Sequence, residues 1–200
     1  MKAQLLALVL GVICTGCGLA DGMLRKQQAI TLATELKVAE SPLGRGRSVQ
    51  VIVSAERPSP EIGRRDLHGP VLLLERRSAD IIRIAVLEGL TREGFAPLID
   101  NASDVHELRV EIQNVQYANG MQDMWTGIVR ASSGVRGICV QGDVRLYEKL
   151  YEEQIVDQRK GLEGQLEPSM ATINKKVSAA ISHALDSMLQ DQKLIECLAQ

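Results

Sequence analysis

Four cysteines and three histidines are the side chains of this chain best suited to covalent or metal chemistry. Cys14 and Cys17 stand three residues apart directly after an apolar run, whereas Cys139 and Cys197 lie far downstream. A thiol can be acylated, oxidised to a disulfide or bound to a metal, and its surroundings decide which. The first pair therefore has to be interpreted together with the residues that flank it.

The histidines and serines are not set in a catalytic pattern. His106–Glu107 begins a metalloprotease-like motif, but Val110 stands where the second histidine is needed. Ser133 lacks the glycine that a nucleophile elbow places two residues before its serine. His68 and His183 stand alone. The sequence therefore predicts a protein that is not an enzyme and that carries no cofactor and no metal site.

Residues 1–16 have the pattern of a secretion signal peptide. Lys2 gives a positive start, residues 5–13 are apolar, and small residues precede Cys17. Nine apolar residues are too few to cross a bilayer, which takes about 20 helical residues. A buried N-terminal helix is the alternative interpretation, and the charge at the start and the small residues at the end argue against it.

The end of this segment resembles the lipobox of bacterial lipoproteins, in which an aliphatic residue and two small residues precede the acylated cysteine. Cys17 follows Thr15 and Gly16 and fits this pattern, although Cys14 replaces the usual leucine. Cys14 itself follows the bulky Ile13 and does not fit. The resemblance implies lipid attachment at Cys17, with a free or disulfide-bonded Cys17 as the alternative. Gly18 in place of aspartate implies sorting to the outer membrane.

Composition limits what the rest of the chain can be. The 200 residues are 45% hydrophobic and 24% charged, which is typical of one compact domain once a signal is removed. Aromatic residues make up only 2%, and the net charge is -2. A stacking platform or a basic footprint for nucleic acid is therefore not expected.

The chain divides into three segments. Residues 1–16 form the signal peptide, residues 17–46 are predicted to be a lipid-anchored tether, and residues 47–200 form one domain. Within the tether, residues 28–36 either form a short edge strand or simply extend. Pro42, Gly44 and Gly46 mark a loop before the domain.

Hydrophobic periodicity predicts the elements of the domain. Helical spacing predicts one helix over residues 79–93, with Ser78 as its N-cap, and a second near the C-terminus, with Ser178, Ser182 and Asp186 on its polar face. Asn119–Gly120 predicts a hairpin turn, a bulge is expected near Asn114, and residues 132–134 allow a bend. Alternating residues predict strands over 49–55, 71–74, 108–117, 125–131 and 138–147, with a weaker strand at 150–159.

This order predicts an α+β domain, a mostly antiparallel twisted sheet with two helices packed on one face, preceded by a signal peptide and a flexible tether. Together with the lipobox it resembles the YajG-like family of bacterial envelope lipoproteins. The resemblance rests on Cys17 and on the segments Ser48 to Pro58, Ile84 to Phe95, Leu108 to Ala118 and Ala171 to Leu189. It implies location and fold, because the family has no established enzyme activity.

Three features outside the lipobox have both a functional and a structural interpretation. The arginines between residues 45 and 77 either meet an anionic surface or are a solvated loop surface. Met121, Met124 and Trp125 either form an exposed partner patch or pack onto the domain. Cys139 and Cys197 either form a disulfide in the oxidising periplasm or remain apart, with Cys139 as a small buried residue.

The resulting function hypothesis is a non-enzymatic lipoprotein, held by Cys17 in the inner leaflet of the outer membrane and facing the periplasm. It would bind another envelope protein through its sheet edge or the Met121, Met124 and Trp125 patch, as part of an envelope assembly or transport system. The alternative is a periplasmic binding module that holds a small lipid or glycan between its sheet and helices. A nucleic-acid partner is not expected.

Overall fold

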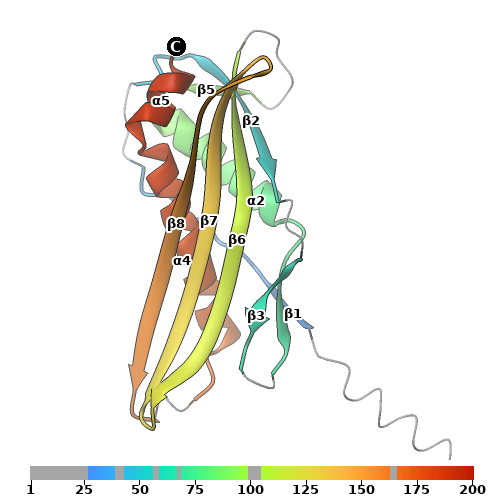
Figure 1. The fold of residues 1–200 in the computed structure, drawn as a ribbon, viewed down its shortest axis with the longest axis vertical. Helices are drawn as coiled ribbons and strands as arrows, with labels where there is room; N and C mark the ends of the chain where they lie inside the picture. The colour runs from blue at the N-terminus through green and yellow to red at the C-terminus, as the bar shows by residue number, and fades with distance from the viewer. Residues whose placement is uncertain (1–26, 39–42, 56–58, 67–68, 99–104, 163–165) are drawn as a thin grey trace, which may run out of the picture.

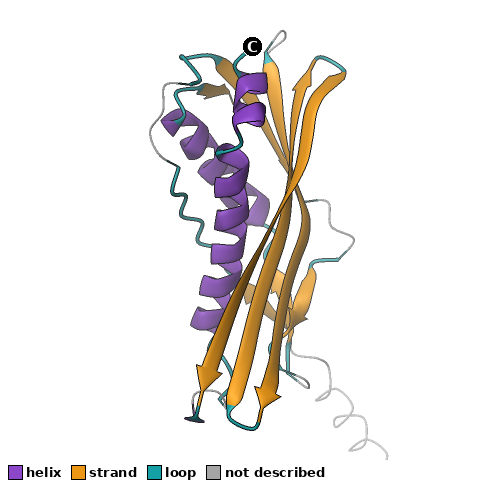
Figure 2. Ribbon diagram, turned by 60° about the vertical axis from the view of Figure 1, so that its left-hand side comes forward, coloured by secondary structure: helices purple, strands orange, loops and turns teal. Residues whose placement is uncertain are grey.

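The computed structural model describes residues 27–38, 43–55, 59–66, 69–98, 105–162 and 166–200. These residues form one eight-stranded sheet, and the helices described with it cover one face of that sheet (Figures 1 and 2). The strands are β1 (Gln27–Ile30), β2 (Ser48–Ser54), β3 (Glu61–Arg64), β4 (Val71–Leu74), β5 (Ala96–Leu98), β6 (His106–Asp123), β7 (Thr126–Gln141) and β8 (Val144–Lys160). The helices are α2 (Ser78–Arg92), α4 (Met170–Leu189) and α5 (Gln192–Leu198).

The long strand β6 organises the sheet. One side of β6 pairs in parallel with β2 near its start, Val49 opposite His106, and with β3 nearer its end, Gly63 opposite Tyr117. The other side pairs with β7 in antiparallel register, and β7 pairs with β8. The tall three-stranded ribbon of β6, β7 and β8 in Figure 1 therefore carries short strands along one flank only.

The sheet is mixed, which corrects the prediction of a mostly antiparallel sheet. Among the described strands, β1–β4, β2–β5, β2–β6 and β3–β6 pair in parallel, and β3–β4, β6–β7 and β7–β8 pair antiparallel. The pairs β2–β5 and β2–β6 are parallel because the chain crosses over through α2 between β2 and these neighbours, and a crossover returns the strand in the same direction. The antiparallel pairs are the two of the long ribbon, whose strands the alternating residues predict, and the short pair β3–β4.

Helix α2 forms where its apolar stripe predicts it, with a different start. Arg77 is the N-cap residue and makes no side-chain cap, while Ser78 is the first helical residue and is buried. The predicted cap at Ser78 is therefore wrong. At the other end Gly94 takes a φ of 83°, and the Phe95 N–H donates to Leu90 O at 3.0 Å. Phe95 is buried beyond this C-cap, as its position predicts.

Helix α4 carries the largest apolar stripe. Ser169 caps it by accepting the Thr172 N–H at 3.1 Å, and Ile173, Val177, Ile181 and Leu185 are fully buried against the sheet. A short third helix, α5, follows after a break at Asp191 and was not predicted. Its seven residues are too few for a helical period to be distinguished in the sequence.

Part of the predicted tether packs on the domain. Strand β1 pairs with β4 at the edge of the sheet, and residues 31–38 continue along α4 as an extended segment, here called the strap. Ile30, Leu32 and Val38 are buried in the main core. The ordered domain therefore includes residues well ahead of Arg47.

The strap explains why the supposed polar face of α4 is buried. The N–H groups of Ala33, Glu35 and Lys37 donate to Ser178 Oγ, Ser182 Oγ and Asp186 Oδ1 at 3.0, 3.1 and 2.8 Å. Two residues of extended chain advance about 6.6 Å, and four residues of helix advance about 6 Å. Every second N–H group of the strap therefore lies opposite every fourth residue of α4. Ser178, Ser182 and Asp186 are therefore not a solvated face, because they accept hydrogen bonds from the strap that covers them.

The ribbon also differs from its predicted turns. The expected bulge is present between Ile112 and Asn114. Strand β6 does not turn at Asn119–Gly120, because pairing with β7 continues to Asp123 opposite Thr126 and the turn falls at Met124–Trp125. Asn119 instead donates from Nδ2 to Arg65 O at 3.2 Å. Strand β7 runs through residues 132–134 without ending, and the next turn lies at Gly142–Asp143.

Candidate interaction site

The β6–β7 turn exposes the three residues of the predicted patch. Met121, Met124 and Trp125 are 55%, 75% and 56% exposed, so they project from the domain and do not pack onto it. Asp123 Oδ1 accepts the Trp125 N–H at 2.8 Å, and this backbone hydrogen bond is the main cause that lowers the pKa of Asp123. An ionised Asp123 thus holds the two-residue turn in shape.

The end of β8 adds two further apolar residues to this turn. The Gly161 N–H donates to Trp125 O at 2.9 Å, which ties the segment after β8 to the turn. Leu162 is 77% and Leu166 65% exposed, and Arg159 Nη1 donates to Leu166 O at 2.9 Å. Nothing in the local sequence indicates this position for the two leucines, because only the fold brings them to the turn. We call Met121, Met124, Trp125, Leu162 and Leu166 the apolar tip.

Strand β8 is the second candidate surface. Its only pairing partner among the described strands is β7, so its other edge carries backbone donors and acceptors that no described strand pairs with. Side chains at alternate positions point to the helices, where Tyr151 is buried. The other positions expose Val144, Leu146, Leu150 and Val156. Their spacing along residues 144–156 was visible in the sequence, but their exposure was not.

The face of the ribbon away from the helices carries charged side chains between these apolar ones. Arg136 in β7 contacts Glu111 of β6 at 3.6 Å and Glu148 of β8 at 3.3 Å. These pairs are partly exposed, and each therefore contributes little to stability. They join neighbouring strands of the ribbon on this face.

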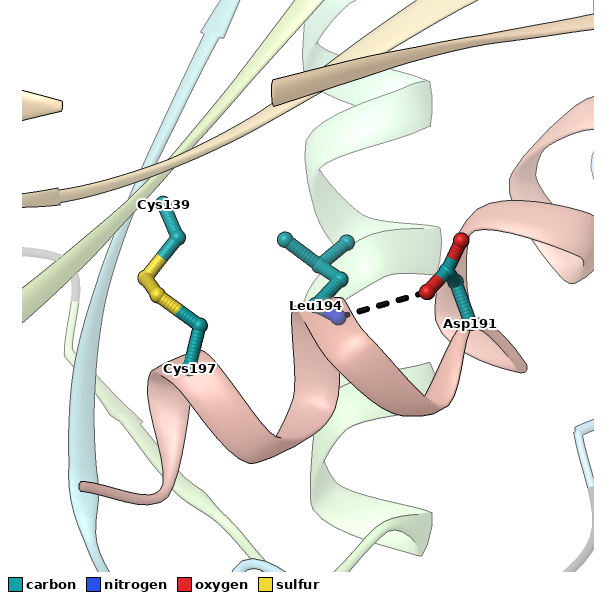
Figure 3. Close-up of a disulfide and its surroundings, with 4 residues drawn as sticks. All are labelled: Cys139, Asp191, Leu194 and Cys197. Carbon is teal, nitrogen blue, oxygen red and sulfur yellow. Dashed lines mark hydrogen bonds between the residues drawn. A yellow bond between two sulfur atoms is a disulfide. The ribbon is translucent and has the colours of Figure 1, made fainter. Parts of the chain in front are cut away.

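The disulfide connects α5 to the sheet. Cys139 in β7 and Cys197 in α5 are bonded, with their Cα atoms 6.5 Å apart, and both are buried (Figure 3). The structure thus contains the bonded alternative of the two that the sequence left open. Closing a loop of 58 residues stabilises the fold by about 4 kcal/mol in the chain-entropy model.

Asp191 begins α5 beside this disulfide. Its Oδ1 accepts the N–H groups of Lys193 and Leu194 at 3.0 and 3.3 Å, the second of which is drawn in Figure 3. Its Oδ2 accepts from Lys149 Nζ at 2.6 Å and from Tyr147 Oη at 3.2 Å. Burial favours the neutral acid, but these hydrogen bonds outweigh it and lower the pKa of Asp191. The cluster has a structural role, since one carboxylate accepts hydrogen bonds both from the first N–H groups of α5 and from two side chains of β8.

A groove runs between the strap and α4. It has a volume of about 640 Å³, and its walls include Glu35, Lys37, Asn174, Lys175 and His183. Asn174 Oδ1 is buried there without a hydrogen-bond partner. This groove lies on the outside of α4, because the space between α4 and the sheet is filled by fully buried side chains.

The other predicted features are dispersed. Arg47 donates to Gln200 O at the C-terminus, whereas Arg65 donates to Pro168 O at 3.2 Å, just before α4. Since the whole of α4 lies between these two contacts, the arginines do not make one surface. His106 is partly buried, and burial and then Arg47 lower its pKa. Cys17, Arg57 and His68 lie outside the described residues.

No group of three or more His, Cys, Asp or Glu side chains in the described residues is arranged to hold a metal ion. Within the same residues, no helix is long and apolar enough to cross a bilayer.

Comparison with solved structures finds similar folds at low sequence identity. It is similar to protein XCC0632 from Xanthomonas campestris, with 11% identity, 86% of this chain and 96% of that chain covered, and a TM-score of 0.52. A neuraminyllactose-binding hemagglutinin homolog from Helicobacter pylori matches at 10% identity, with 84% and 97% covered and a TM-score of 0.49. Rare lipoprotein B from Shewanella oneidensis matches at 12% identity, with 74% and 98% covered and a TM-score of 0.41. The first of these likenesses shows a shared fold.

Comparison with curated proteins finds no match. A family model described as "uncharacterized lipoprotein", Lipoprotein_16, matches residues 34–199, which include residues 34–38 of the strap, every helix described here and the disulfide. The resemblance that the sequence segments carry is thereby confirmed, and the chain belongs to this YajG-like family of uncharacterized lipoproteins.

Proposed function

We propose that this protein is a non-enzymatic lipoprotein, anchored by acylated Cys17 in the inner leaflet of the outer membrane. Its domain faces the periplasm and binds another envelope protein through the open edge of β8. The observation that carries the proposal is a 17-residue strand with β7 on one side and no described strand on the other. An extended segment of a partner can add to such an edge through backbone hydrogen bonds.

The side chains of β8 indicate what that segment would be like. Leu146, Leu150 and Val156 are exposed at 44%, 42% and 50% and lie among charged residues. A partner strand with apolar residues at alternate positions would extend this row, while Arg145, Glu148 and Glu152 would limit pairing to partners of matching charge. Charged residues on an edge also discourage aggregation, which fits a surface that selects one partner.

Site-specific photo-crosslinking in cells tests the proposal. The row Gln116, Ser132 and Gln154 runs straight across β6, β7 and β8, so Gln154 lies on the edge strand and Gln116 lies two strands inward. A photo-reactive residue at Gln154 is expected to capture one envelope protein that mass spectrometry identifies. The matched residue at Gln116 is expected to capture none.

A substitution at the edge provides the second arm. Val156→Lys is expected to abolish the crosslink from Gln154, whereas Gln116→Lys leaves it unchanged. Identical products from Gln154 and Gln116, or no product from Gln154, would show that the edge is not the binding site. A crosslinker at Met121 tests the apolar tip as the partner patch, and a product there alone would move the protein contact from β8 to the turn.

The groove between the strap and α4 supports a second candidate, a binding site for a small polar ligand such as a glycan fragment. Its volume of about 640 Å³ and the buried, unpartnered Asn174 Oδ1 favour it. Native mass spectrometry of the purified lipoprotein is expected to show a bound small molecule, lost in Asn174→Leu. A spectrum of the chain without added mass would exclude this candidate.

A further inference from the structure

Strand β1, where the described part of the chain begins, starts at its end nearer the apolar tip. Strand β6 runs toward the tip, β3 runs parallel to β6, and β4 is antiparallel to β3. Strand β1 is parallel to β4 and therefore runs away from the tip, so Gln27 is its tip-side end. Figure 1 shows β1 and β3 beside the half of the ribbon that ends in the tip.

The sequence between Cys17 and Gln27 is long enough for the tip to reach the membrane. Through the pairs Gln27–Val71 and Val71–Arg64, Gln27 is level with the residue after Tyr117 in β6. The five residues from there to Asp123 advance the ribbon by ~17 Å. Ten residue steps from Cys17 to Gln27 span at most ~35 Å. A bilayer that holds the lipid on Cys17 is thus within range of the tip.

We propose that the apolar tip inserts into the surface of the bilayer to which the protein is anchored and acts as a second membrane contact. Five of the large apolar side chains that are exposed in the described residues gather at this end. Trp125 suits the headgroup region, since an indole has an apolar body and one N–H donor. Met121, Met124, Leu162 and Leu166 would lie among the upper acyl carbons.

The shape of the tip favours a lipid surface over a protein. A two-residue turn that projects from a narrow ribbon offers little area, whereas a stable protein interface takes about 800 Å² on each partner. A convex apolar tip enters a fluid bilayer without needing a complementary pocket. The lysine at the end of β8, Lys160, lies opposite Thr126 beside the turn and is exposed, so it can meet lipid phosphates.

This orientation would also set the direction of the open edge of β8 relative to the membrane. Strand β8 runs antiparallel to β7 and ends at Lys160, opposite the first residue of β7. With the tip in the bilayer, the edge that we propose as the protein-binding surface would rise from the membrane along its whole length. The inference depends on the lipid anchor and is independent of any partner of β8.

Trp125 is the only tryptophan in the chain and therefore reports on the tip directly. The full lipoprotein is reconstituted into vesicles of phosphatidylethanolamine and phosphatidylglycerol, with and without brominated acyl chains. We expect brominated lipid to quench the emission of Trp125 and the vesicles to protect it from aqueous iodide. Quenching by iodide with no loss in brominated lipid would overturn the inference.

Two matched substitutions complete the experiment. Met124→Asp places a charge at the most exposed residue of the turn and is expected to abolish quenching by brominated lipid. Leu150→Asp, also at an exposed apolar position but along β8, is expected to leave the quenching unchanged. Equal thermal unfolding of the two variants shows that both are folded, and equal quenching in the two would contradict insertion of the tip.

Flotation of the vesicles separates this inference from the proposed function. Protein that floats with the vesicles but leaves Trp125 open to iodide contradicts only the inserted tip. Protein that does not float contradicts the lipid anchor and the inference together. Protection of Trp125 that requires an added envelope protein, and is absent in lipid alone, would assign the tip to a protein partner and overturn the inference.

Discussion

Asp186 Oδ1 accepts the backbone N–H of Lys37 at 2.8 Å, across 149 residues of sequence. This contact is the last of three that hold the strap on α4. Asp186→Ala leaves the N–H without a partner in a part-buried position, and we expect it to lower the free energy of unfolding by about 1–3 kcal/mol. Urea unfolding measures the loss, and hydrogen exchange at Lys37 is expected to accelerate.

The control for this prediction is Asp80→Ala, which removes an exposed aspartate of α2 whose ion pair with Arg83 spans 3.5 Å. That change is expected to alter the free energy of unfolding by less than about 0.5 kcal/mol. Similar losses in both variants, or unchanged exchange at Lys37, would contradict the role assigned to Asp186.

Removal of the disulfide is expected to loosen α5 before the rest of the domain. The paired change of Cys139 and Cys197 to alanine should lower the free energy of unfolding by about 4 kcal/mol, because the unfolded chain regains the freedom of a 58-residue loop. Guanidinium unfolding of this variant and of the reduced native chain is expected to give the same midpoint. A reduced protein as stable as the oxidised one would show that the bond does not stabilise the fold.

Asp191 is expected to make stability depend on acid pH. Its pKa in the folded protein lies below the ordinary value of about 3.9, so its contribution is fully present above about pH 4 and is lost as the pH falls through the folded pKa. Thermal melts of the native protein and of Asp191→Asn should therefore converge below about pH 4. Melting curves that differ by a constant amount down to pH 2 would be inconsistent with this assignment.

Gly63 is expected to tolerate no side chain. Its φ is 144°, and a Cβ atom there would lie 2.1 Å from Tyr117 O, where β3 meets β6. We expect Gly63→Ala to lower the free energy of unfolding by more than about 2 kcal/mol, because backbone atoms cannot move aside easily. Gly120→Ala is the matched control, since a Cβ there meets nothing within 4 Å. Equal melting temperatures of the two variants would refute the close approach.

Local patterns in the sequence predicted the elements that bury their own apolar stripe. The helices near residues 79–93 and 171–189 and the bulge near Asn114 need only neighbouring residues to be recognised, and the structure contains all three. The family was identified from the order of these segments. For Cys139 and Cys197 the sequence allows two alternatives, because the distance between residues 58 apart cannot be derived from spacing.

Only the tertiary structure decided which segments far apart in the sequence contact one another. Asn119–Gly120 has the residues of a tight turn, but pairing with β7 carries β6 on to Asp123, because long cross-strand pairing outweighs one local preference. Ser178, Ser182 and Asp186 look solvated on an isolated helix and are buried only because the strap returns across them. Likewise, Leu162 joins Trp125 at the tip only because β8 ends where the β6–β7 turn lies. The sequence by itself determined helices α2 and α4 and the alternation of the long strands, since each depends on neighbouring residues. The turn, the buried polar row and the apolar tip depend on contacts between segments far apart in the chain, and only the folded structure brings those segments together.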